Sequence, residues 1–222
     1  MPHDRLSVLT ELQTQGVCPV FYDPDPATAL NVIRACARGG APVIEFTNRG
    51  DFAVDLFGEI ARELGRTDPD IVLGIGSVLD AGTAAMFLNR AARFVVSPAL
   101  VPEVATVCNR RMVAYFPGCG SVTEISEAQA LGCEIVKLFP GASVGGPDFV
   151  KAVLGPMPWT KIMPTGGVDP DAASIAKWFG SGIVAAGMGS RLITDAAVRD
   201  GDWAGIEASV RNAVEAVRAF RA

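Results

Sequence analysis

The sequence predicts an α/β fold, a (β/α)8 TIM barrel that forms a single domain over residues 1–222 with an extra N-terminal helix. Short, apolar, β-branched runs recur at intervals of roughly 20 to 28 residues, and segments with helical periodicity lie between them, as in parallel βαβ units. Eight such runs suit a closed barrel, which has no sheet edges. The rival fold, a doubly wound open sheet, predicts a Gly-x-Gly-x-x-Gly turn after the first strand, where this chain has "FYDPDP".

Each predicted strand is one of these apolar runs, and in chain order they cover residues 17–22, 42–46, 71–75, 94–97, 112–116, 135–139, 160–164 and 183–186. The helices predicted between them cover residues 26–38, 52–64, 81–92, 101–110, 122–131, 148–154 and 170–179, with further helices at both ends. Capping signals mark three helix starts: Asp25 before Pro26, Ser121 three residues before Glu124, and Asp169 before Pro170.

The composition excludes several classes of partner. A net charge of -5 disfavours nucleic acid and anionic membranes, and no run approaches the roughly 20 apolar residues that a membrane span needs. The 5 cysteines form no Cys-x-x-Cys pair, and their odd number argues against a disulfide framework. We therefore expect a soluble cytoplasmic protein without a leader segment.

The chain has one histidine, His3, which we expect to lie at a frayed end. A Ser-His-Asp or Cys-His triad, a histidine-type zinc site and a histidine general base all lack their central residue. Any chemistry must therefore use carboxylates, lysines, hydroxyls or the backbone.

Lysine in the run "EIVKLFPG" is the leading candidate for a nucleophile. Lys137 lies late in a predicted buried strand, and active sites of such barrels form at the carboxyl ends of the strands. Lysine attacks a carbonyl as a neutral amine, which an apolar environment favours. Lys151 and Lys177 fall on predicted helices, and Lys161 falls at the opposite end of a strand. The alternative is a structural lysine whose ammonium group pairs with Glu45 or Glu134.

Glu45 and Arg49 belong to the run "VIEFTNRG". Strand alternation points Glu45 to the same side as Val43 and Thr47, opposite to Ile44, so it is a candidate proton shuttle. A structural Glu-Lys pair would use the same residues. Arg49, just past the strand end, suits a carboxylate, although a surface arginine is the common alternative.

Two glycine-containing turns follow the last two predicted strands. "TGG" spans Thr165 to Gly167 and "GMGS" spans residues 187–190, so each turn offers backbone N–H groups between a strand and a helix. Loops at these two positions of a barrel commonly bind phosphate. The pair of turns therefore predicts a phosphorylated ligand.

Taken together, the motifs resemble one family: the class I, Schiff-base aldolases of 2-keto-3-deoxy-6-phosphogluconate (KDPG) and 4-hydroxy-2-oxoglutarate (KHG), which are (β/α)8 enzymes. The resemblance covers most of the chain. Its segments occur in the family's order: "VIEFTNR", "GIGSVLDA", "VVSPAL", "FPGCGSVTE", "EIVKLFP", "MPTGG" and "GMGS".

The resemblance implies that Lys137 forms the Schiff base with the pyruvate carbonyl and that Glu45 accepts and returns a proton. Arg49 and Ser77 would hold the pyruvate carboxylate and carbonyl end, although the family usually has threonine in place of Ser77, and Thr165 would orient the substrate. Four turn residues would bind phosphate: Gly166, Gly167, Gly189 and Ser190. No metal and no cofactor is implied, and a homotrimer is expected.

The chain departs from the family pattern in three segments. After "CPV" the family usually has a basic residue where this chain has Phe21-Tyr22-Asp23, and "TNRGDF" and "PGCGS" are also unusual. Within the class, KHG or 2-keto-3-deoxy-6-phosphogalactonate are alternative substrates. A phosphosugar isomerase or synthase on the same barrel, or a non-catalytic phosphate-ligand binder, are alternatives outside it.

Overall fold

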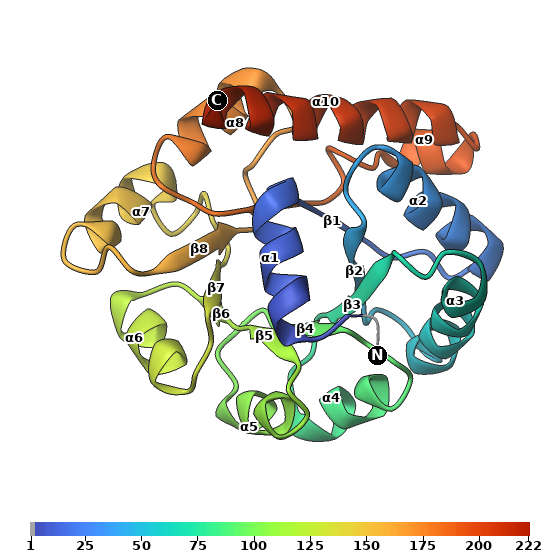
Figure 1. The fold of residues 1–222 in the computed structure, drawn as a ribbon, viewed down its shortest axis with the longest axis horizontal. Helices are drawn as coiled ribbons and strands as arrows, with labels where there is room; N and C mark the ends of the chain where they lie inside the picture. Colours follow the sequence, from blue (N-terminus) through green and yellow to red (C-terminus); the bar gives the residue numbers. More distant parts are fainter. Residues whose placement is uncertain (1–2) are drawn as a thin grey trace.

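The computed structural model describes residues 3–222 and shows a ring of parallel strands enclosed by helices (Figure 1). The strands are β1 (Val17–Phe21), β2 (Val43–Thr47), β3 (Val72–Gly76), β4 (Phe94–Val96), β5 (Ala114–Phe116), β6 (Gly118–Cys119), β7 (Ile135–Leu138), β8 (Lys161–Pro164) and β9 (Ala186–Met188). They pair in the orders β5-β4-β3-β2-β1-β9 and β6-β7-β8.

The two groups of strands join into one closed barrel. Only Pro117, which has no backbone N–H, separates β5 from β6, so these two segments form a single barrel strand. On the other side, a parallel bridge joins Thr165 to Gly187, and the Val184 N–H donates to the Ile162 carbonyl at 3.0 Å. The predicted (β/α)8 barrel is therefore confirmed.

The helices are α1 (Arg5–Gln15), α2 (Pro26–Arg38), α3 (Ala53–Thr67), α4 (Ala81–Leu88), α5 (Pro102–Arg110), α6 (Val122–Ala130), α7 (Gly146–Leu154), α8 (Ala172–Phe179), α9 (Asp195–Arg199) and α10 (Trp203–Arg221). The Asp25 side chain caps α2 through the Thr28 N–H at 2.7 Å. The Ser121 hydroxyl caps α6 through the Glu124 N–H at 3.3 Å. These two of the three predicted caps are confirmed.

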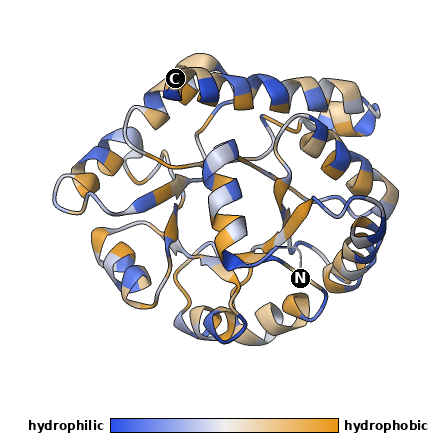
Figure 2. Ribbon diagram, in the orientation of Figure 1, coloured by the Kyte–Doolittle hydropathy of each residue, from blue (hydrophilic) through white to orange (hydrophobic). Residues whose placement is uncertain are grey.

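The apolar core has two layers, one between the strands and the outer helices and one inside the barrel. Figure 2 shows strands that are largely hydrophobic and helices that carry both kinds of residue. Inside the barrel, side chains such as Val43, Phe94 and Met163 form a cluster with Val8 and Leu12 of α1. The extra N-terminal helix thus covers the centre of the ring at one end (Figure 1), so the barrel interior is closed there and a ligand would enter it from the opposite end.

The last predicted strand and one predicted cap were wrong. β9 begins at Ala186 rather than at residue 183, because pairing with Val17 of β1 starts there. Gly187 consequently lies in the strand instead of in a turn. Helix α8 is capped by Asp171, which accepts a hydrogen bond from the Ser174 N–H at 2.9 Å. Asp169 instead forms an ion pair with Arg191.

Candidate active site

Lys137 and Glu45 meet inside the barrel. Lys137 lies on β7 and Glu45 on β2, and Lys137 Nζ is 3.9 Å from Glu45 Oε1. Their side chains are 6% and 1% exposed, so the pair is shielded from water. Lys137 Nζ also lies 5.0 Å from the centre of the Phe139 ring. Glu134, the other predicted partner, is instead 2.8 Å from Arg5 at the opposite end of β7.

The environment of Glu45 suits a group that exchanges protons. Burial raises the pKa of Glu45, and the positive charges of Lys137 and Arg49 partly oppose this shift. Among residues 3–222, Glu45 Oε2 is one of a few buried polar side-chain atoms without a hydrogen-bond partner. A buried carboxyl group with a raised pKa and a free oxygen can hold a proton and release it to a bound molecule.

Glycine at position 76 makes room for this carboxyl group. A Cβ atom on Gly76 would lie 1.8 Å from Glu45 Oε1. Gly76 ends β3, where it pairs with Thr47 two residues beyond Glu45, and Ser77 follows with a φ of 62°. The structure therefore puts half-buried Ser77 directly after the residue that packs on Glu45.

Thr165 directly follows β8, is half-buried, and packs against Gly187 of β9. A Cβ atom on Gly187 would lie 2.3 Å from Thr165 Oγ1, so a small residue at this position allows the threonine to pack there. In the described part of the chain, Thr165 Oγ1 also has no hydrogen-bond partner. This hydroxyl can orient a ligand at the mouth of the barrel.

The predicted phosphate turns line one cavity of about 290 Å³. Its walls include Arg49, Thr165 and Phe139 as well as the four predicted turn residues, Gly166, Gly167, Gly189 and Ser190. Within residues 3–222 the structure records no hydrogen bond donated by the N–H groups of Gly166, Gly167 or Ser190. These donors are therefore available to an anion.

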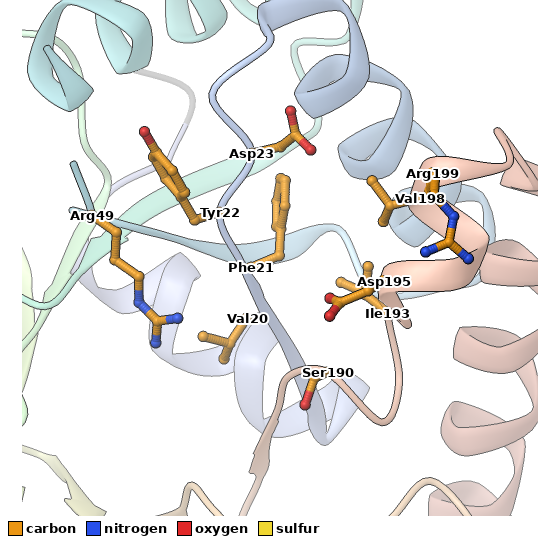
Figure 3. Close-up of a pocket in the computed structure, with 10 residues that line it drawn as sticks. All are labelled: Val20, Phe21, Tyr22, Asp23, Arg49, Ser190, Ile193, Asp195, Val198 and Arg199. Atoms are coloured by element: carbon orange, nitrogen blue, oxygen red, sulfur yellow. The ribbon is translucent and has the colours of Figure 1, made fainter. Parts of the chain in front are cut away.

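A second cavity of about 410 Å³ adjoins the first (Figure 3). The two share Val20, Phe21, Arg49 and Ser190. The second cavity is further lined by Tyr22 and Asp23, which follow β1, and by Asp195 and Arg199 of α9. Arg49 and Arg199 lie on opposite sides of the view in Figure 3. The unusual segment Phe21-Tyr22-Asp23 thus belongs to the wall of this second cavity.

Two residues at the site, Arg191 and Cys18, were not predicted from the sequence. Arg191 lines the first cavity and directly follows the turn that ends at Ser190, where an arginine in sequence looks like an ordinary solvated residue. Cys18 lies inside the barrel near Glu45 and Lys137, and burial raises the pKa of its thiol. Nothing in the run "VCPVF" distinguishes an inward-facing cysteine from an ordinary apolar residue.

Two absences within residues 3–222 bear on other functions. No group of three or more His, Cys, Asp or Glu side chains could hold a metal ion. None of the helices has the length and apolarity required to cross a membrane. His3, expected to be frayed, has a ring nitrogen 2.9 Å from the Pro69 carbonyl oxygen.

Comparison with known proteins identifies the family. Residues 8–209 match the aldolase family described as KDPG and KHG aldolase. The 2-dehydro-3-deoxy-phosphogluconate aldolase of Pseudoalteromonas atlantica is 32% identical over 202 residues, which cover 90% of this chain and 91% of that protein. The KHG/KDPG aldolase of Escherichia coli K12 is 29% identical over 218 residues, which cover 98% of this chain and 100% of that protein.

A solved structure agrees with these relatives. It is the KDPG aldolase of Legionella pneumophila with pyruvate captured at low pH as a covalent carbinolamine intermediate. The two folds match with a TM-score of 0.82 at 26% identity, over 92% of this chain and 95% of that one. The chain therefore belongs to the KDPG and KHG aldolase family.

Proposed function

We propose that this protein is a class I aldolase, an aldehyde-lyase, that cleaves KDPG or a related 4-hydroxy-2-oxo acid to pyruvate and an aldehyde through a Schiff base on Lys137. The observation that carries the proposal is the buried Lys137–Glu45 pair inside the barrel. A lysine amine supplies the nucleophile, and a carboxyl group with a raised pKa supplies the proton shuttle.

The reaction follows from these two groups. The neutral amine of Lys137 attacks the C2 carbonyl, and loss of water from the carbinolamine gives a protonated imine. The C3–C4 bond then breaks, its electron pair moves toward the imine nitrogen to form an enamine, and the C4 hydroxyl proton passes to Glu45 through water. The aldehyde departs, Glu45 returns a proton to C3, and hydrolysis of the imine releases pyruvate and the amine.

The remaining residues bind the substrate in this proposal. Arg49 and Ser77 hold the carboxylate and carbonyl end of pyruvate, and the guanidinium of Arg49 suits a carboxylate because it donates in a planar fork. Thr165 orients the portion that becomes the aldehyde. The phosphate of the substrate lies against the glycine turns at Gly166, Gly167, Gly189 and Ser190, where the N–H groups of Gly166, Gly167 and Ser190 are free to donate.

A pyruvate-release assay over a panel of substrates tests the activity. The panel contains KDPG, its galactonate epimer and KHG, and pyruvate is followed with lactate dehydrogenase. We expect the wild type to cleave at least one of them and Lys137→Met to lose the activity. Lys161→Met is the matched control, because Lys161 is exposed at the opposite end of β8. Cleavage by Lys137→Met at the wild-type rate, or none by the wild type, contradicts the proposal.

We also propose a cytosolic homotrimer in which each chain is one domain. Leu79 and Met86 support an association surface, since 61% and 48% of these apolar residues are exposed near α4. Light scattering coupled to gel filtration measures the mass, and a trimer is the expected result. A single cooperative unfolding transition is expected for a single domain.

A further inference from the structure

We propose that Arg191 is the specificity-determining residue that makes this site prefer phosphorylated substrates, by donating a charged hydrogen bond to the phosphate. This inference rests on the proposed aldolase function. It adds a residue that neither the glycine motifs nor the Lys137–Glu45 pair identifies.

The first step is the charge that a phosphate requires. A phosphate monoester carries a charge of about −1.5 to −2 at neutral pH. The N–H groups of Gly166, Gly167 and Ser190 are neutral donors, so they supply hydrogen bonds without a formal charge. The cavity lined by these turns contains two cationic side chains, Arg49 and Arg191, and no acidic residue. Arg49 is engaged by the substrate carboxylate, which leaves Arg191 for the phosphate.

The second step is the choice between the two cavities. The neighbouring cavity of about 410 Å³ has two arginines, Arg49 and Arg199, but Asp23 and Asp195 also line it. Two carboxylates therefore line the neighbouring cavity, whereas the one carboxylate paired with Arg191, that of Asp169, lies outside the lining of the glycine cavity. A dianion therefore favours the side of Arg191 over the side of Arg199.

The third step is the position of the Arg191 side chain. Arg191 Nη1 is 2.5 Å from Asp169 Oδ1, and Asp169 itself is fixed by a 3.0 Å bond from its N–H to the Ser174 hydroxyl. The ion pair thus links the segments that follow the two glycine turns. Of the five N–H donors of an arginine, the structure records a bond from Nη1 within the described residues, so Nε and Nη2 remain for a phosphate oxygen.

The exposure of the Arg191 side chain sets how much phosphate affinity its removal should cost. The Arg191 side chain is 69% exposed, so water weakens its bond to a phosphate compared with a buried arginine. A charge-assisted hydrogen bond of this kind corresponds to a loss of about tenfold in affinity when it is removed. The effect should appear only with substrates that carry the phosphate.

The experiment compares KDPG with 2-keto-3-deoxygluconate, which has the same carbon chain without the phosphate. Wild type, Arg191→Ala, Arg191→Lys and Arg199→Ala are assayed for kcat/KM, and binding of inorganic phosphate is measured by calorimetry. We expect Arg191→Ala to lose about tenfold in kcat/KM with KDPG and in phosphate affinity, with no change for the unphosphorylated substrate. Arg191→Lys restores part of the loss, and Arg199→Ala matches the wild type.

Three results overturn the inference: an equal loss on both substrates, no loss with either, or a phosphate-dependent loss in Arg199→Ala equal to that in Arg191→Ala. Failure of the proposed function looks different. In that case the wild type cleaves none of KDPG, its galactonate epimer, KHG and 2-keto-3-deoxygluconate, while the calorimetric comparison of wild type with Arg191→Ala still decides whether Arg191 binds phosphate.

Discussion

Substituting Gly76 by alanine is expected to disable the proton shuttle without removing any catalytic side chain. The added Cβ would lie 1.8 Å from Glu45 Oε1, so the carboxyl group must withdraw by about 1.2 Å to reach the 3.0 Å below which real contacts essentially never fall. Gly76 is absent from the residues with positive φ, so alanine is compatible with the backbone there. A misplacement of about 1 Å can cost roughly 100-fold in rate, and we expect a loss of that order in kcat/KM.

Two assays and one control make this prediction specific. Pyruvate release measures the full reaction, and NMR in D2O measures exchange of the pyruvate methyl protons, which requires the shuttle and the lysine but no aldehyde. Both should fall in Gly76→Ala. Gly65→Ala is the matched control, since no atom outside its chain neighbours and the backbone of α3 lies within 4 Å of the added Cβ. A folded Gly76→Ala protein with wild-type rates in both assays would refute the claim that the reaction depends on where the Glu45 carboxyl group lies.

Three further predictions concern Glu45 and helix α1, which covers one end of the barrel. Glu45→Gln cannot carry a proton, so kcat should fall about 10²- to 10⁴-fold in the pyruvate-release assay, and a smaller loss would mean that another group moves the proton. Because burial raises the pKa of Glu45 above its usual 4.5, the folded protein binds more protons than the unfolded chain above that pH and loses stability as pH rises toward the folded pKa. Urea unfolding should therefore show Glu45→Gln gaining stability relative to wild type as pH rises through this window, and a constant difference would contradict the shift. Leu12→Ala, at a fully buried site in α1, should cost about 2–5 kcal/mol of unfolding free energy, and a negligible change would show that α1 does not seal the interior.

Most of the barrel could be predicted because apolar periodicity reflects burial, while Gly, Pro and Asp mark the turns between strands and helices. Lys137 and Glu45 were predictable as a pair because each is the one charged residue in a buried, largely apolar strand. The family resemblance then gave each residue a proposed role.

The predicted cap of α8 and the predicted start of β9 were wrong because neighbouring residues in the sequence could fill each position equally well. In "DPDA" either Asp169 or Asp171 can cap a helix, and the ion pair of Asp169 with Arg191 across the site accompanies the use of Asp171. The start of β9 depends on pairing with β1 and on the packing of Thr165 against Gly187, neither of which has a local signal. Arg191 was missed because an arginine after a turn usually has a solvated side chain.

The central claim is that Lys137 forms a Schiff base with pyruvate, and borohydride trapping tests it most directly. The protein is incubated with pyruvate and sodium borohydride, digested, and analysed by peptide mass spectrometry. The account predicts a reduced pyruvyl adduct on the peptide that contains Lys137, with Lys151, Lys161 and Lys177 unmodified, and no adduct when pyruvate is omitted. Recovery of the unmodified Lys137 peptide from active protein would contradict it.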